Sequence, residues 1–266
     1  MASRYQCSLP SDVLEKAIKD LNEPENIDKR LESIDNLKAR FKEKCDKFEL
    51  LDESDEFLLR FLRSCEFDLE YSLKTLECYH KIRREWREVF DLVENKKNIR
   101  KSFASGPSIF WGGRAKDGSF ILLQRPGLGN SLAKLIASVF LSYEKMIENE
   151  EAQIFGITVI VDLSHLGFRM GMQMTSIGKR FLRMLQEVLP IRIISINIVN
   201  EAYVFDAMFA IVSNFMSSHI KQKMRFHRHN LHELHESIDA NSLPPFLGGT
   251  GQEIDIEEWT REVIDT

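Results

Sequence analysis

Several features that would place this chain in other protein classes are missing from its sequence. Its four cysteines, Cys7, Cys45, Cys65 and Cys78, lack the Cys-x-x-Cys spacing of zinc and redox sites. We therefore expect free thiols in a reducing, cytoplasmic compartment. The opening residues MASRYQCSLPSD contain no apolar core of a secretory signal. No run of about eighteen apolar residues occurs, so we expect no helix that spans a membrane.

Motifs for catalysis and cofactor binding are also scarce. GGRAKDG and GGTGQ contain neither the GxxxxGK[ST] nor the GxGxxG pattern, so we interpret them as turns rather than nucleotide loops. HELH at residues 232–235 is one residue short of the HExxH zinc motif, and no third ligand is evident. No Ser-His-Asp order or reactive-cysteine context occurs. We expect no metal, no cofactor and no enzymatic activity.

Charge gives a similar exclusion with one local exception. The net charge of −5 provides no overall basic field, so we expect no nucleic acid as a partner. Between Lys179 and His229, however, eight Lys and Arg face three acidic residues, a local balance of +5. A basic run of this kind is either a solvated surface or a site that meets anionic lipid headgroups.

The basic residues bracket a strongly apolar stretch, VNEAYVFDAMFAIVSNFM, at residues 199–216. Asn200, Glu201 and Asp206 would be costly at bilayer depth, which excludes a membrane span. The apolar residues occupy more than one stripe of a helix, so a single packed face does not account for them. This stretch needs a second apolar partner besides a sheet, which is more protein, a bound lipid or a membrane.

Periodicity predicts an α/β fold with an all-helical N-terminal module. Helices are expected over about residues 11–22 and 27–41, a short one within 52–68, and a long one over 68–86, with apolar residues at helical spacing. A hairpin of residues 108–111 and 120–124 follows. Buried-type strands at Ile157–Leu163 and Ile193–Val199 alternate with helices at about 132–149 and 173–189, which is typical of a βαβ sheet. Short helices are expected in NLHELHESI and at Ile254–Ile264.

Three separated motifs resemble one known family. FLLRFLRSCEFDLEYSL at residues 57–73 resembles the N-terminal helical signature of the CRAL-TRIO (Sec14-like) lipid-binding family. LPIRIISINIVNEAYVFDAMFAIVSNFMSSHIKQKMRFH at residues 189–227 and SLPPFLGGT at residues 242–250 resemble its lipid-binding domain. The resemblance covers nearly the whole chain. It implies a helical domain at residues 1–92 and a lipid-binding domain with a C-terminal helix at residues 93–266.

The resemblance further implies a hydrophobic pocket beneath a mobile helical lid at about Asn200–Lys223. Positions similar to pocket-lining ones of the family are Ile157, Val161, Phe181, Met184, Leu185, Leu189 and Ile196. On the lid, helical spacing selects Val204, Phe205, Met208, Phe209 and Val212. Glu144 matches a pocket carboxylate of the retinaldehyde-binding branch, and Tyr143 takes the place of a polar pocket serine in the tocopherol-carrying branch. Glu144 is either such a group or a solvent-facing helix residue.

A basic phosphoinositide cleft of the family is only partly matched. Arg192 and Lys223 match its cations, whereas Cys65 and His219 stand where two others would be. Lys221, Arg63 and protonated His219 are candidates to compensate.

The function that the resemblance implies is that of a cytosolic monomer that carries a tocopherol, retinoid or carotenoid between membranes. The membrane surface is then a transient partner, with or without a phosphoinositide. Alternatives are a phospholipid or phosphoinositide exchange protein, a retinoid-isomerising enzyme using Glu144, and a membrane-recruited scaffold with a vestigial pocket.

Overall fold

The computed structural model describes residues 4–45, 48–129, 131–202 and 204–266. The chain forms two compact units, of which the first comprises Met1–Trp86, Ile147–Ile154 and Met184–Arg192. The second comprises Arg87–Met146, Phe155–Arg183 and Ile193–Thr266. The predicted domain boundary at residues 92 and 93 stays a prediction, because these units are interleaved along the chain.

The first unit is helical, as the spacing of apolar residues predicts. Two of its N-terminal helices, α2 and α4, begin at side chains that cap them: Asn26 accepts the backbone N–H of Asp28 at 2.7 Å, and Asp68 accepts that of Tyr71 at 2.9 Å. The helices of this unit are α1 (Ser11–Leu21), α2 (Ile27–Lys44), α3 (Asp55–Ser64), α4 (Leu69–Glu85), most of α8 (Glu150–Phe155) and the π-helical segment η3 (Met184–Val188).

Two of these elements reach the first unit from the middle of the chain. The segment containing α8 connects a helix to a strand of the second unit, and the segment containing η3 does the same one step later. Within the first unit, η3 packs on α4. The first unit therefore contains two of the segments that connect a helix to the next strand of the second unit.

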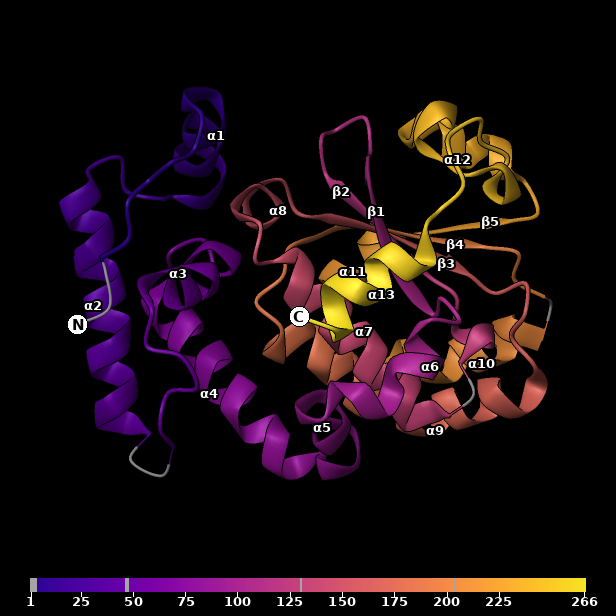
Figure 1. The fold of residues 1–266 in the computed structure, drawn as a ribbon, viewed down its shortest axis with the longest axis horizontal. Helices are drawn as coiled ribbons and strands as arrows, with labels where there is room; N and C mark the ends of the chain where they lie inside the picture. The colour runs from indigo at the N-terminus through magenta and orange to yellow at the C-terminus, as the bar shows by residue number, and fades with distance from the viewer. Residues whose placement is uncertain (1–3, 46–47, 130, 203) are drawn as a thin grey trace. The chain divides into compact units, whose positions relative to one another are not determined.

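The second unit is an α/β domain with a five-stranded mixed sheet (Figure 1). The strands stand in the order β1-β2-β3-β4-β5; β1 is antiparallel to β2, and the other neighbours are parallel. The strands are β1 (Ser108–Arg114), β2 (Phe120–Gln124), β3 (Ile157–Asp162), β4 (Ile193–Val199) and β5 (Met224–Arg228). The predicted hairpin, both buried strands and the fold class are confirmed.

The helices of the second unit lie on both faces of this sheet. In Figure 1, α7, α9 and α10 occupy one side, and α12 occupies the other. The bounds are α5 (Arg87–Glu94), η1 (Lys96–Ile99), α6 (Arg100–Phe103), η2 (Pro126–Leu128), α7 (Leu132–Met146), α9 (Phe168–Arg183), α10 (Val204–Val212), η4 (Ser213–Phe215), α11 (Ser218–Lys223), α12 (Leu231–Ser237), η5 (Ala240–Ser242), η6 (Pro245–Leu247) and α13 (Ile256–Ile264).

Alternation along the strands assigns each residue to a face of the sheet. Ile121, Leu123, Ile160 and Val199 form a buried core with α12 and the loop that follows it. The strand register places the intervening residues on the opposite face, since adjacent partners in a parallel pair point to the same side. The residues on that second face are Leu122, Gln124, Val159, Val161, Ile196, Ile198, Met224 and Phe226.

Three elements differ from the sequence-based expectation. Helix α9 begins at Phe168, five residues before the predicted 173. The basic run after residue 216 contains strand β5, whose Phe226 and His227 face opposite sides of the sheet. The sequence predicts one helix through Trp86 and none directly after it. In the structure α4 ends at Glu85, and a further helix, α5, begins at Arg87. The segment Met224–Arg228 contains no β-branched residue, so its strand conformation depends on pairing with β4 rather than on intrinsic propensity.

Candidate functional site

The second face of the sheet is apolar and only partly covered. Val159 and Ile198 are buried, whereas their respective partners across the strands, Ile196 and Val161, are half-buried. The intermediate burial of Val161 and Ile196 shows that the rest of the chain does not cover their side chains completely. This face therefore forms the floor of the candidate site.

A segment running from Asn200 to Lys223, which we call the lid segment, lies beside this floor. Its first helix, α10, carries half-buried Phe205, Met208, Phe209 and Val212, and no α10 residue with a described side chain is fully buried. The side chain of Val204 lies outside the described residues. An ordinary core helix buries an apolar stripe, whereas α10 leaves every described side chain at least partly accessible.

The lid segment rests on two glycines of α9. A Cβ atom at Gly171 would lie 2.4 Å from Met208 Cε, and one at Gly178 would lie 3.1 Å from Val212 Cγ2. The two glycines are seven residues apart, which places them two turns apart on one face of the helix. Because the glycines have no side chains, Met208 and Val212 of α10 approach the backbone of α9 closely.

The other support of the lid segment is an aromatic cluster on strand β5. Phe226 lies 4.9 Å from Phe209 and 6.2 Å from Phe205 between ring centroids, and the two lid phenylalanines stack at 5.8 Å. Phe226 belongs to the same sheet face as Ile196 and Ile198. The lid segment thus spans from α9 to the last strand of the sheet.

Polar contacts fix the start of the lid segment. Asn200 has a left-handed φ of 58°, which Asn adopts more readily than most residues. Its backbone N–H donates to the Arg228 carbonyl at 2.6 Å, and its amide donates to Asp162 at 3.0 Å. The Arg228 backbone N–H donates to Glu201 at 2.9 Å, and its guanidinium pairs with Asp206 at 3.0 Å. These contacts fix residues 200–201 against the ends of strands β3 and β5.

The CRAL/TRIO domain matches residues 105–249 of the sequence, which include this floor and the lid segment. The chain belongs to the CRAL/TRIO domain family. It is a family of lipid-binding and lipid-transfer proteins that take small lipophilic ligands. The resemblance found in the sequence is thereby confirmed.

Curated relatives of the family match nearly the whole chain. Alpha-tocopherol transfer protein-like from Mus musculus is 32% identical over 98% of this chain and 76% of the relative, and the Homo sapiens protein of that name is 31% identical over the same shares. Clavesin-1 from Rattus norvegicus is 28% identical over 98% of this chain and 75% of its own. The crystal structure of Sfh5 has the same fold, with a TM-score of 0.51 at 14% identity, covering 95% of this chain and 92% of that one.

The remaining pocket residues suggested by the CRAL/TRIO resemblance fall in both units. In the second unit, Ile157 is fully buried at the start of β3, and Phe181 is half-buried on α9. In the first unit, Met184 and Leu189 are buried and Leu185 is half-buried around η3. That these residues line one pocket with the lid segment stays a prediction.

Two polar groups on α7 belong to the same region of the second unit. Tyr143 is 1% exposed, and its hydroxyl accepts a hydrogen bond from the Gln124 amide at 3.2 Å. Burial raises the pKa of Tyr143, so this phenol stays protonated and retains a hydrogen to donate. Glu144 is half-buried on the next helical position. Gln124 was not selected from the sequence; its place on the floor follows only from the strand register.

The cations of the suggested phosphoinositide cleft differ in their surroundings. In the second unit, His219 and Lys221 are exposed, whereas Lys223 donates from Nζ to the Ile193 carbonyl. In the first unit, Arg192 donates to the Ile154 carbonyl, and burial lowers its pKa. His219 and Lys221 are accessible to an external anion; Arg192 and Lys223 have main-chain acceptors that such an anion would have to replace.

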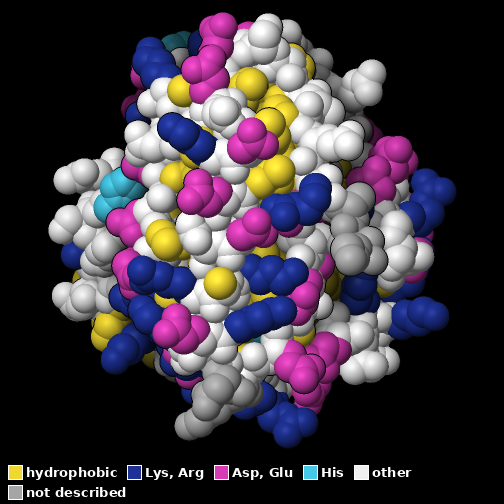
Figure 2. All heavy atoms as spheres, turned by 90° about the vertical axis from the view of Figure 1, so that its left-hand side faces the viewer, with side chains coloured by type: hydrophobic (Ala, Val, Ile, Leu, Met, Phe, Trp, Pro, Cys, Tyr) yellow, Lys and Arg dark blue, Asp and Glu magenta, His cyan; other side chains and the backbone are white. Residues whose placement is uncertain are grey.

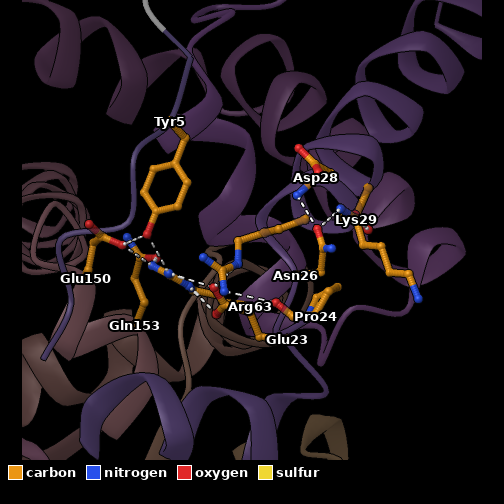
Figure 3. A network of polar contacts seen from close by, with 11 residues as sticks. Tyr5, Glu23, Pro24, Asn26, Asp28, Lys29, Arg63, Glu150 and Gln153 are labelled. Atoms are coloured by element: carbon orange, nitrogen blue, oxygen red, sulfur yellow. Dashed lines mark hydrogen bonds and ion pairs between the residues drawn. The ribbon is translucent and has the colours of Figure 1, made fainter. Parts of the chain in front are cut away.

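The idea that Arg63 supplies a missing cleft cation is wrong. Arg63 is 0% exposed, and its guanidinium contacts Glu23 at 2.8 Å and 3.0 Å, Glu150 at 2.8 Å and Gln153 at 3.0 Å (Figure 3). Tyr5 completes the network, with its hydroxyl 2.6 Å from Glu150 and 3.2 Å from Arg63. These contacts hold Arg63 inside the first unit, away from any lipid headgroup.

Surface charge, membrane-spanning helices and metal-ligating side chains were the other features by which a site could be recognised among the described residues. On the face drawn in Figure 2, Lys and Arg side chains are interspersed with Asp and Glu. Within the described parts of the chain, no helix is long and apolar enough to cross a bilayer. His227, from the histidine-rich run, is buried and bonded to Asn197 at 3.0 Å. No group of three or more metal-ligating side chains gathers among the residues described.

Proposed function

We propose that this protein encloses one small lipophilic molecule of the tocopherol, retinoid or carotenoid class and transfers it between membranes. The observation that supports this most directly is the lid segment, whose apolar side chains are half-buried beside a half-covered apolar floor. Kinship with proteins named for tocopherol transfer adds to it. The molecule would be held between the floor and α10, with its apolar body against Val161, Ile196 and Phe209.

Affinity would come mainly from covering apolar surface. Removing about 300 Å² of apolar area from water is worth about 7 kcal/mol before the costs of ordering the ligand. The polar pair Tyr143 and Gln124 would orient a hydroxyl or carbonyl group of the ligand, since a mostly apolar cavity fixes orientation through few polar contacts. Glu144 is the second candidate for that role.

We further propose that the lid segment opens at a membrane surface. Phe168 and Met172 on α9 are 67% and 47% exposed, and Ile211 and Phe215 on the lid segment are 53% and 45% exposed. Phe168 and Met172 are four residues apart on α9 and share one helical face, whereas Ile211 lies on α10 and Phe215 on the following η4. A membrane that binds these side chains better in the open state would shift the lid equilibrium toward opening. The protein would be cytoplasmic and associate with membranes only peripherally.

Transfer of a fluorescent tocopherol analogue between two vesicle populations tests the proposal. Phe209→Asp places a charge between the lid segment and Phe226, and we expect retention of the analogue to fall at least about tenfold because an unpaired carboxylate is costly at an apolar contact. Ala207→Asp is the matched control, since Ala207 is exposed on the same helix. Equal retention by the two variants would contradict the lid assignment.

A phosphoinositide could assist opening through His219 and Lys221, which are the accessible cations of the lid segment. We expect vesicles with anionic phosphoinositide to accelerate transfer, and the His219→Ala/Lys221→Ala variant to lose that acceleration. If Arg192→Ala/Lys223→Ala also loses the acceleration, the cleft cations matched by the resemblance take part as well. If it keeps the acceleration, His219 and Lys221 are sufficient. Transfer that ignores anionic lipid in all variants would remove phosphoinositide sensing from the proposal.

The proposed role is non-catalytic, and a ligand-conversion assay separates it from isomerisation. We expect a bound retinoid to be recovered chemically unchanged from both the parent protein and Glu144→Gln. Turnover that disappears in Glu144→Gln while binding survives would instead identify Glu144 as an acid–base group.

A further inference from the structure

The edge strand β1 borders a groove in the second unit that is separate from the lid and floor. The groove has a volume of about 870 Å³. Residues Phe110–Arg114 of β1 line it, together with Thr250–Glu253 and the α13 residues Glu258, Trp259 and Glu262. Figure 1 shows α13 beside the β1–β2 end of the sheet, which agrees with the contacts between α13 and β1.

The two walls of the groove are attached to successive residues of β1. The Phe110 ring packs edge-on against Trp259 of α13, with 5.7 Å between ring centroids. The Trp111 indole points the other way and donates to the Ser242 carbonyl at 3.2 Å. Because neighbouring side chains of a strand point to opposite faces, the backbone of β1 itself lies between the walls. The groove therefore runs along the open edge of the sheet.

In the described part of the chain, the outer side of β1 has no strand beside it, although at its start the Ser108 carbonyl already accepts hydrogen bonds from Trp259 and Ser142, so an added segment could pair only beyond that residue. Strand β1 stands first in the sheet order, and β2 is its only strand neighbour among the described residues. Phe110 pairs with Leu122 and Arg114 with Phe120, so residues 111–113 bulge out of that ladder. Gly112 is exposed, and a Cβ added to it would meet no atom within 4 Å. An open edge of this kind is a template for an added strand.

The charge of the groove is strongly one-sided. Glu253, Glu258 and Glu262 line it with exposed side chains, and none has an ion-pair partner in the described part of the chain. Arg114 is the single basic residue of the lining, and its guanidinium lies 4.0 Å from the centroid of the Phe120 ring. These carboxylates complement a positively charged occupant.

We propose that this edge groove binds a basic, extended segment of a partner protein, which adds as a strand to β1. Main-chain hydrogen bonds to the edge would supply affinity, and alternate side chains would reach the two walls. Arginine or lysine at every second position would face the carboxylates of α13. This inference does not depend on the lipid site, because none of the residues that carry it belongs to the floor or the lid segment.

A blocked hexapeptide of alternating arginine and valine is the probe, and calorimetry with amide hydrogen exchange is the measurement. We expect saturable binding below about 1 mM and slower exchange at residues 111–114. Only alternate peptide N–H groups face a strand edge, so N-methylation at the arginines or at the valines, but not both, should weaken binding about tenfold or more. Binding unaffected by either N-methylated series overturns the strand-addition geometry.

Charge variants test the second half of the proposal. Glu258→Gln/Glu262→Gln should weaken the peptide about three- to tenfold, which corresponds to two exposed ion pairs. Glu236→Gln is the control, because Glu236 is an exposed acid of the same unit outside the groove. A glutamate–valine hexapeptide should not bind. Equal binding of the acidic and basic peptides, or no saturable binding of the basic one, overturns the proposal. An unchanged melting temperature establishes that each variant is folded.

Discussion

Replacing Arg63 by methionine should destabilise the first unit strongly. Both Arg63 and its partner Glu23 have 0% exposed side chains, and the change removes two charge-assisted hydrogen bonds to that carboxylate. It also removes the donors to Tyr5, Glu150 and Gln153. Removing one partner of a buried ion pair costs about 3–5 kcal/mol.

The remaining arginine of the network moderates this cost. Arg30 Nε lies 2.8 Å from Glu23 Oε1 and is 1% exposed, so the carboxylate keeps one cation beside it. We therefore expect the lower end of the range, about 3 kcal/mol, which corresponds to a fall in melting temperature of about 6–12 °C for a chain of this size.

Thermal and urea unfolding of matched variants measure this effect. Arg40→Met removes the same charge from an exposed pair with Glu70, whose side chains are 44% and 61% exposed, so it should change the free energy of unfolding by less than about 1 kcal/mol. If Arg63→Met unfolds within about 1 kcal/mol of Arg40→Met, the buried network does not stabilise the unit in the way its geometry indicates.

Three further changes probe other parts of the molecule. Burial lowers the pKa of His80 below 6.5, so the unfolded chain binds the proton more readily than the folded one. The free energy of unfolding should therefore fall as the pH drops below about 6.5. His80→Gln should reduce this loss, measured by urea unfolding at about pH 8 and pH 5. Arg228→Ala removes the exposed pair with Asp206, and ligand exchange at low salt should accelerate by no more than about fivefold. Gly178→Leu pushes a side chain into Val212, so retention of a tocopherol analogue should fall while the melting temperature changes by only a few degrees; unchanged retention would show that α10 does not seat on this glycine.

The main elements of the fold follow from the sequence because their patterns are local. The strands at Ile157–Asp162 and Ile193–Val199 consist mainly of β-branched residues, and Asn26 and Asp68 cap the helices that follow them. Strand β5 has no such pattern, since its Met, Arg, Phe, His and Arg residues become a strand only by pairing with β4. Edge pairing of this kind depends on tertiary context rather than on propensity.

The candidate site could be predicted only where side-chain type carries the information. The apolar surplus of residues 204–216 indicates a second apolar partner, whatever that partner is. The role of Gly171 and Gly178 as seats for α10 has no sequence signal, because a glycine in a helix is equally compatible with many packings. The role of Arg63 could not be predicted either. The sequence does not distinguish an arginine that meets lipid headgroups from one that pairs with a buried Glu23, and only the burial seen in the structure separates the two.

The interleaving of the two units has a consequence for synthesis on the ribosome. Arg63 finds its partners Glu150 and Gln153 almost ninety residues later in the chain, and η3 reaches α4 later still. The N-terminal helices emerge first, yet their unit lacks these contacts until residues 150–188 have been translated. During that interval Arg63 lacks two of its hydrogen-bond acceptors, Glu150 and Gln153. The helical module would therefore complete its folding together with strands β3 and β4, as one event in time rather than as an independent first domain.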